Sequence, residues 1–154
     1  MTIEYTISQF HERYLEDMVA SFIESFERWN IREARRYLSQ SYEAFSDLCF
    51  VAVNPQEECL GAVFCKEAPY QAGKICMVEA LQVKKEFRNQ GIGKALLTKA
   101  VEAAKKKDMT FIGMLAPATA RFPLRLYEDM GFRQTGWVEL VTNVDDINLL
   151  TPRI

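Results

Sequence analysis

The sequence predicts one α/β domain over residues 1–154, with a mixed, mostly antiparallel central sheet and helices on both faces. Two observations predict this fold class. Strand-like runs separated by turn-forming residues follow one another from residue 48 to residue 83. The last run then enters a glycine-containing loop and a long helical repeat over residues 91–107, and further strand and helix patterns follow.

The first third of the chain predicts a strand followed by two helices. Residues 3–7 alternate between apolar and polar side chains, as a short strand does. We expect Ser8 to cap a helix whose apolar stripe runs to Phe26. The segment Trp29-Asn30-Ile31 interrupts the pattern, and a second helix is expected from Arg32 to Ser39 or slightly beyond.

The middle third predicts three antiparallel strands. Leu48–Val53 form a continuous apolar run, and Cys59–Cys65 return after a turn at residues 54–58. A second loop at residues 68–73 leads into the strand Lys74–Val83. Alternation along this last strand places Val78, Ala80 and Gln82 on one face and Glu79, Leu81 and Val83 on the other.

The loop after this strand has the composition of a phosphate-binding loop. Residues 88–94 read Arg-Asn-Gln-Gly-Ile-Gly-Lys and stand at the start of the long helix. The first N–H groups of a helix lack internal acceptors and carry partial positive charge, so they stabilise an anion. The two glycines let the backbone approach a ligand closely. We therefore expect a phosphate group here; a solvated turn that uses glycine only for its geometry is the alternative.

Two other phosphate-binding motifs do not fit this loop. A Walker-type loop needs four residues between its glycines and then Lys followed by Ser or Thr. Here one residue separates the glycines, and Ala95 follows Lys94. A dinucleotide fingerprint needs a third glycine and an acidic ribose ligand about 20 residues further on. Leu96 stands at the glycine position, and Asp108 precedes the next strand instead of ending it.

The rest of the chain predicts a strand, a helix and two more strands. The strand Met109–Leu115 is followed by a helix in which Pro123 introduces a kink or delays the start. Gly131 is a typical C-terminal stop for this helix. Residues 132–142 alternate as a strand does, and residues 148–151 form a last short one.

The composition argues against several classes of function. The net charge is −2 and the isoelectric point is about 5.5, whereas nucleic-acid binding favours basic surfaces. The sequence contains no apolar run of roughly 18 residues, so we expect no membrane span. It does not begin with the basic-then-apolar pattern of a secretory signal. These features predict a cytoplasmic protein without nucleic-acid or membrane partners.

The cysteines and the histidine do not form a recognisable metal or nucleophile motif. No two of the four cysteines have Cys-x-x-Cys spacing, and His11, the one histidine, lies in an expected surface helix. We therefore expect no metal site and no Cys–His nucleophile. The cysteines lie mostly in apolar stretches, which predicts buried, reduced thiols.

Two motifs resemble the signatures of the Gcn5-related N-acetyltransferase (GNAT) family. Residues 88–93, Arg-Asn-Gln-Gly-Ile-Gly, fit the family's acetyl-CoA signature Arg/Gln-x-x-Gly-x-Gly/Ala. Residues 126–132, Leu-Tyr-Glu-Asp-Met-Gly-Phe, fit its Leu-Tyr-x-x-x-Gly-Phe motif, with a helix and a strand between the two as in the family. The resemblance covers about half the chain. It implies a sheet that splays between the strand ending at Val83 and the strand starting at Met109, forming a cofactor cleft.

The resemblance also implies a reaction and a cofactor. The protein is expected to transfer the acetyl group of acetyl-CoA to a primary amine of a small molecule or peptide, by direct attack in a ternary complex and without a metal. An enzyme nucleophile is not needed for this reaction, in agreement with the absence of a Ser–His or Cys–His pair. The cofactor-binding residues implied are Leu81, Gln82, Val83, Arg88, Asn89, Gln90, Gly91, Ile92, Gly93 and Lys94.

Two residues are implied as catalytic and two as substrate-binding. Tyr127 is the expected acid for the leaving thiolate, with packing as its alternative role, and Glu79 is the expected base, with a surface glutamate as the alternative. In the family a helix–loop–helix covers the acceptor pocket. Here that segment offers Phe26 and Trp29, together with Phe22 and Tyr37, and the alternative is that these rings are core residues.

One departure from the family pattern keeps a second function open. Ala120 stands seven residues before Tyr127, where the family often has asparagine, so a polar contact to the cofactor is missing or replaced. A non-catalytic acyl-CoA sensor is therefore the rival reading, against which the retained Tyr127 argues. A nucleotide-binding regulator is a third. The acceptor and the oligomeric state stay open, although the resemblance makes a homodimer one expectation.

Overall fold

The computed structural model describes residues 2–118 and 121–148 of the chain. The chain forms two compact units, Met1–Leu115 and Ala116–Ile154, and each is described by itself below. The single domain over residues 1–154 stays a prediction. Within the described residues, no helix is both long and apolar enough to cross a membrane.

The first unit is built on one five-stranded sheet in the order β1-β2-β3-β4-β5. Neighbouring strands are antiparallel from β1 to β4, and β4 and β5 are parallel. This arrangement confirms the predicted mixed, mostly antiparallel sheet. The strands are β1 (Thr6–Gln9), β2 (Phe50–Val53), β3 (Cys59–Tyr70), β4 (Gly73–Val83) and β5 (Phe111–Met114).

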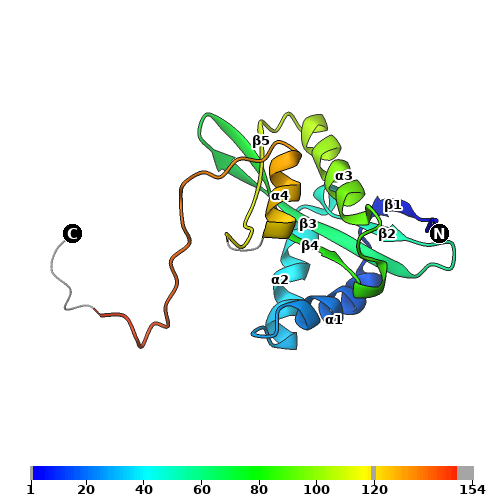
Figure 1. The fold of residues 1–154 in the computed structure, drawn as a ribbon, viewed down its shortest axis with the longest axis horizontal. Helices are drawn as coiled ribbons and strands as arrows, with labels where there is room; N and C mark the ends of the chain where they lie inside the picture. The colour runs from blue at the N-terminus through cyan, green and yellow to red at the C-terminus, as the bar shows by residue number, and fades with distance from the viewer. Residues whose placement is uncertain (1, 119–120, 149–154) are drawn as a thin grey trace. The chain divides into compact units, whose positions relative to one another are not determined.

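Helices cover both faces of this sheet, as predicted. Figure 1 shows α1 (Leu15–Ser25) and α2 (Ile31–Ala44) on one side of the long strands and α3 (Ile92–Lys106) on the other. Adjacent residues of β4 reach the two sides: the Gln82 side chain donates to Ser21 of α1, whereas Val83 lies 3.7 Å from where a Cβ would stand on Gly93 of α3. Short 3₁₀ helices lie at Glu12–Tyr14 (η1), Ser46–Leu48 (η2) and Lys85–Phe87 (η3).

The apolar core between α1, α2 and the sheet fixes the position of these helices. Met18, Val19 and Leu38 are fully buried against strand residues such as Phe64. Burial of one such side chain contributes about 1.5–3 kcal/mol, so this cluster holds the two helices over β3 and β4. The break between α1 and α2 lies at the edge of this core, where the partly buried Trp29 packs against the cluster.

The N-terminal segment differs from its prediction in where its elements begin. The first strand covers Thr6–Gln9 and pairs with β2, so the expected strand at residues 3–7 is shifted and Ser8 lies inside it. The prediction of Ser8 as a helix cap was wrong. The cap is His11, whose Nδ1 accepts from the Arg13 N–H at 3.0 Å. The second helix begins earlier than expected, because Asn30 caps it by accepting from the Glu33 N–H at 2.8 Å, and it ends later, at Ala44.

The central hairpin is longer than predicted. The expected loop at residues 68–73 is a tight turn at Gln71 and Ala72, because β3 continues to Tyr70 and β4 starts at Gly73. Gln71 takes the left-handed conformation that such a turn requires, with φ of 49°. The turn at residues 54–58 is confirmed: the Asn54 N–H donates to the Glu58 carbonyl at 3.0 Å.

The second unit contains the helix α4 (Arg121–Asp129). Pro123 is its third residue, so of the two predicted effects the structure has the delayed start. Proline has no N–H, but N–H groups of the first helical turn have no acceptor within the helix, so Pro123 costs no helical hydrogen bond there. The strand expected at residues 132–142 was wrong, because these residues take no regular secondary structure. Of the short strand expected at residues 148–151, residues 149–151 lie outside the described part of the chain.

Candidate active site

Glu79 is the extra residue of a β-bulge in β4. Phe64 pairs with Ala80 and Cys65 pairs with Val78, so Glu79 has no opposite residue on β3. A bulge bends the strand and re-aims the side chains beside it. The bulge turns Glu79 towards α2, on the side where Ala80 joins the core cluster. The predicted face shared with Val83, which packs against α3, was therefore wrong for Glu79.

The carboxylate of Glu79 is held by two neighbours. The Tyr37 hydroxyl of α2 lies 3.0 Å from Oε2 and 2.8 Å from the Glu79 carbonyl oxygen. The Lys66 Nζ of β3 lies 2.5 Å from Oε1. The Glu79 side chain is 19% exposed, so it is neither a free surface glutamate nor a fully buried one. The structure thus shows an anchored anion that solvent and small ligands can still reach.

Aromatic rings connect this carboxylate with the break between α1 and α2. The ring of Trp29 lies 4.8 Å from that of Tyr37 and 5.3 Å from that of Phe22. Phe26 follows at 4.7 Å from Phe22 and is 49% exposed. The two predicted substrate-binding residues, Trp29 and Phe26, therefore belong to one aromatic row that ends at Glu79. Phe22 is buried and serves as core.

The loop between β4 and α3 uses two left-handed residues to turn into the helix. Asn89 has φ of 63° and Gly91, the N-cap of α3, has φ of 83°. An L side chain is strained at such an angle, so glycine at position 91 has a backbone reason. Arg88 braces the loop: its Nε donates to the Val83 carbonyl at 2.9 Å and its Nη2 to Ser25 Oγ at 3.0 Å.

At the start of α3, three amides have no acceptor within the helix or elsewhere among the described residues. The first backbone bond of the helix runs from the Ala95 N–H to the Gly91 carbonyl at 3.0 Å, so the amides of Ile92, Gly93 and Lys94 precede it. A Cβ built on Gly91 meets nothing within 4 Å, which leaves the loop backbone open to an anion. With the helix dipole and the exposed Lys94, these residues fit a phosphate group.

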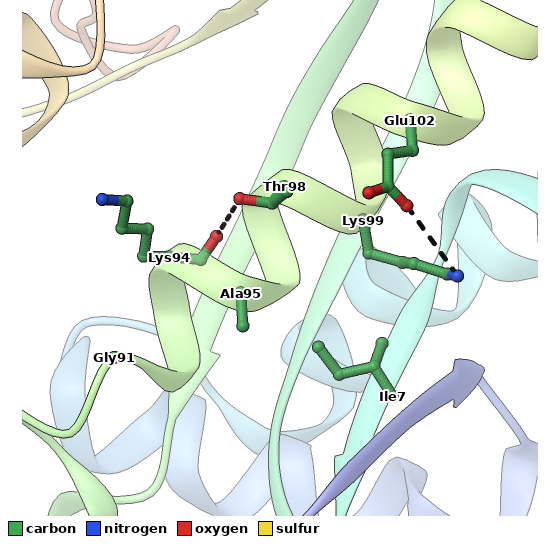
Figure 2. A pocket seen from close by; sticks show the side chains of 7 residues that line it. All are labelled: Ile7, Gly91, Lys94, Ala95, Thr98, Lys99 and Glu102. Carbon is green, nitrogen blue, oxygen red and sulfur yellow. Dashed lines mark hydrogen bonds and ion pairs between the residues drawn. The ribbon is translucent and has the colours of Figure 1, made fainter.

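A hollow of about 420 Å³ lies beside the first turns of α3 (Figure 2). Lys99 on its wall pairs with Glu102 at 3.9 Å, and the Thr98 hydroxyl donates to the Lys94 carbonyl at 2.8 Å. The hollow is open to solvent, and its lining is mostly apolar with charged side chains of both signs. Its lining consists of Ile7, Gly91, Lys94, Ala95, Thr98, Lys99 and Glu102.

The remaining predicted cofactor residues differ in what they offer. Leu81 and Val83 are half-buried on β4, and Gln90 is exposed in the loop. Gln82 is buried, and its amide donates to Ser21 Oγ at 2.9 Å and Ser25 Oγ at 3.0 Å, which leaves only its main chain for a cofactor. The β4 strand continues to Val83 beyond its last pair with β5, at Val78 and Met114. The ladder ends where β5 ends, so the predicted splay between these two strands stays a prediction.

Tyr127 lies on α4 in the second unit. Its ring lies 6.0 Å from that of Phe132, whose N–H donates to the Tyr127 carbonyl at 3.0 Å. Burial raises the pKa of the Tyr127 hydroxyl, which therefore keeps its proton at neutral pH. This protonation state suits the predicted acid. Ala120, the departure from the family pattern, lies outside the described residues.

The four cysteines are all buried and free. Burial raises the pKa of the Cys49 and Cys59 thiols to about 12, so these two groups carry little thiolate at neutral pH. Both lie in the sheet core and not beside the Glu79 carboxylate. Cys49 and Cys59 therefore have the character of packing residues and not of nucleophiles.

Sequence reasoning missed two neighbours of Glu79. Lys66 belongs to no motif, and its meeting with Glu79 depends on the bulge, for which the sequence carries no signal. Tyr37 was a candidate lining residue only. Its hydrogen bonds to Glu79 follow from the packing of α2 over β4.

Comparison with known proteins agrees with this geometry. Residues 10–132 match the profile of the acetyltransferase (GNAT) family. N-alpha-acetyltransferase 30 of Xenopus laevis is 32% identical over 115 residues, which are 66% of this chain and 41% of that protein. The chain thus spans less than half the length of this relative.

Two solved structures share the fold. A putative acetyl transferase from Pyrococcus furiosus has a TM-score of 0.71 at 25% identity, covering 91% of this chain and 100% of that one. The NatC complex bound to Gag peptide and CoA contains a chain with a TM-score of 0.66 at 23% identity, covering 85% of this chain and 86% of that one. The second likeness concerns the fold alone.

Proposed function

Because the chain belongs to the acetyltransferase (GNAT) family, we propose that it transfers the acetyl group of acetyl-CoA to a primary amine of a peptide or small molecule. Direct attack in a ternary complex is the proposed route. One observation carries the proposal: the anchored carboxylate at the β4 bulge and the open amide end of α3 belong to one continuous strand–loop–helix. An anion site and an ammonium site thus flank the same stretch of β4.

The loop and α3 supply the proposed cofactor end of the site. The amides of Ile92, Gly93 and Lys94 would hold the pyrophosphate, because they are free of helical bonds and lie at the positive end of the helix dipole. Arg88 keeps the loop against the end of β4 through the Val83 carbonyl. When bound, acetyl-CoA supplies the thioester whose acetyl group is transferred.

Glu79 supplies the proposed acceptor end. A partly exposed carboxylate attracts the ammonium of the acceptor and then takes its proton, directly or through water. Trp29 and Phe26 offer apolar and cation–π contacts to the part of the acceptor next to the amine. Tyr127 is proposed as the donor that protonates the leaving thiolate, a role that its retained proton supports.

The comparisons favour a peptide α-amine as the first acceptor to examine. The relative in Xenopus laevis is named an N-alpha-acetyltransferase, and the NatC complex is described with a Gag peptide and CoA. A row of exposed and half-buried aromatic rings beside Glu79 suits the first side chain of such a peptide. Small-molecule amines are the second class in the same proposal.

A panel of acceptors tests the proposal. Thiol release from acetyl-CoA is followed with peptides bearing free N-termini, polyamines, aminoglycosides and amino acids, each with a blocked-amine counterpart as control. The proposal expects thiol release with at least one free amine and none with its blocked form. Binding of CoA without thiol release for any class would instead favour the acyl-CoA sensor, the function that Ala120 in place of the usual asparagine keeps open.

A further inference from the structure

The ion pair between Lys66 and Glu79 places a primary ammonium on the carboxylate proposed for the acceptor. Lys66 Nζ lies 2.5 Å from Glu79 Oε1. Lysine and an acceptor amine present the same chemical group, an ammonium with N–H donors. In the structure, therefore, a group from β3 already makes the contact that the ammonium of an acceptor needs.

The two members of this pair are held to different degrees. Tyr37 binds Glu79 at both its carboxylate and its carbonyl oxygen, and the bulge fixes the local backbone. Lys66 carries its charge on a flexible four-carbon stem, and its side chain is 48% exposed, against 19% for Glu79. When the pair opens, the lysine moves into water while the carboxylate stays in place.

We propose that Lys66 is an internal stand-in for the acceptor amine, which binds by displacing it from Glu79. The inference rests on the proposed function, since it names the acceptor subsite of that reaction. The exchange replaces one ammonium by another, so the carboxylate is never left without a counter-charge. Lys66 thereby lowers the affinity for the acceptor. A neutral or poorly placed group does not displace the Lys66 ammonium from Glu79.

The exposure of Lys66 determines how strongly it competes with the acceptor for Glu79. Ion pairs near the surface contribute little, so displacing Lys66 changes acceptor affinity by roughly two- to fivefold. Arginine at the same position would bind the carboxylate through two parallel N–H bonds and lower the affinity for the acceptor further. Substitutions at position 66 should therefore change acceptor affinity in opposite directions: removal of the charge raises it, and arginine lowers it.

A matched pair on the same hairpin provides the control. Lys74 and Glu67 join β4 and β3 at 3.8 Å, with the lysine 57% exposed. Lys74→Met removes the same charge from the same two strands without touching Glu79. Lys66→Met keeps the length of the stem and removes only the ammonium.

The test measures the KM for a cationic acceptor and, without acetyl-CoA, the binding of butylammonium by NMR titration. Lys66→Met is expected to lower both the KM and the Kd by roughly two- to fivefold, Lys66→Arg to raise both, and Lys74→Met to change neither. Weaker binding in Lys66→Met would overturn the proposal, because Lys66 would then position Glu79. Unchanged binding in both Lys66 variants would overturn it as well.

The two readouts separate this inference from the proposed function. If Lys66→Met binds butylammonium more tightly but the protein acetylates no amine, the displacement of Lys66 is supported and the proposed acetyl transfer is refuted. Acetyl transfer with the same KM in the wild type and both Lys66 variants would refute the displaced lysine alone.

Discussion

Glu79 is the residue proposed to act on the acceptor amine. Glu79→Gln keeps the shape and the Tyr37 contact but removes the charge, so kcat/KM for amines should fall by roughly 10²–10⁴ and the acid-side limb of its pH profile should move. Glu67→Gln on the neighbouring strand is the control, because it too has a lysine partner. Loss at every pH with an unmoved limb would leave Glu79 as a binding group only, and no loss would remove it from the site.

The hydroxyl of Tyr127 is the group proposed to protonate the leaving thiolate. Tyr127→Phe should lower kcat by roughly 10²–10⁴ with CoA binding little changed. Burial raises its pKa above the ordinary value of 10.0, so the donor form persists below that pH and is lost only as pH rises through the higher pKa. A basic-side decline in kcat well below pH 10, or turnover near wild type in Tyr127→Phe, would contradict the assignment.

At the residue scale the sequence singled out candidate residues, but it did not predict their contacts. Glu79 and Gly91 were recognised from local pattern, and a left-handed φ of 83° supplies a backbone reason for the glycine. The side on which Glu79 lies was predicted wrongly, because strand alternation assumes an unbroken ladder and the bulge adds one residue. Lys66 was not predicted at all, since ion pairs between distant residues leave no trace in a single sequence.

The loop and the first turn of α3 are the element that should bind CoA. Gly93 can carry a side chain without strain, because its Cβ would make ordinary contact with Val83 at 3.7 Å. Gly93→Glu places a negative charge at the amide end of the helix and should weaken CoA binding by roughly tenfold or more, as measured by calorimetry. Gly93→Ala is the control, because it adds a side chain at the same position without adding a charge. A folded Gly93→Glu protein with wild-type CoA affinity would exclude this loop as the cofactor site.

The elements themselves were predictable where periodicity was long and turns were marked. The helix α3 matches its expected span closely because its apolar stripe and glycine cap agree. The loop predicted between β3 and β4 was too long, because Ala68 and Pro69 are weak strand formers that pairing with β4 keeps extended. The strand expected at residues 132–142 rested on alternation alone, and these exposed residues take no regular structure.

For the whole molecule, the thiols report on the integrity of the core. Burial raises the pKa of Cys49 and Cys59 from 9.0 to about 12, so the stability that these two neutral thiols contribute is complete below pH 9 and is lost as pH rises through about 12. A thiol reagent at pH 8 should label none of the four buried cysteines in the native protein and all of them after denaturation. Rapid labelling of Cys49 or Cys59 in the native state would contradict the packed core.

The fold class of the whole chain was predictable because several local signals agree. Three consecutive strands, a glycine loop and a long helix leave few topologies, and the order of the two motifs indicates the family that the comparison then shows. The identity of the acceptor was not predictable in the same way. The side chains proposed for the acceptor site, Phe26, Trp29 and Lys66, have contacts that arise from the packing of α1, α2 and the hairpin and not from a local motif.

The central claim, acetyl transfer from acetyl-CoA to a primary amine, is tested most directly by the fate of a labelled acetyl group. The protein is incubated with acetyl-CoA carrying ¹³C in its acetyl carbons and with an amine selected from the acceptor panel, and the products are followed by mass spectrometry. The account predicts that the labelled acetyl group appears on the amine nitrogen, with one free CoA thiol released for each acetylated amine. Tight CoA binding with no labelled amine, across every acceptor class in the panel, would contradict it.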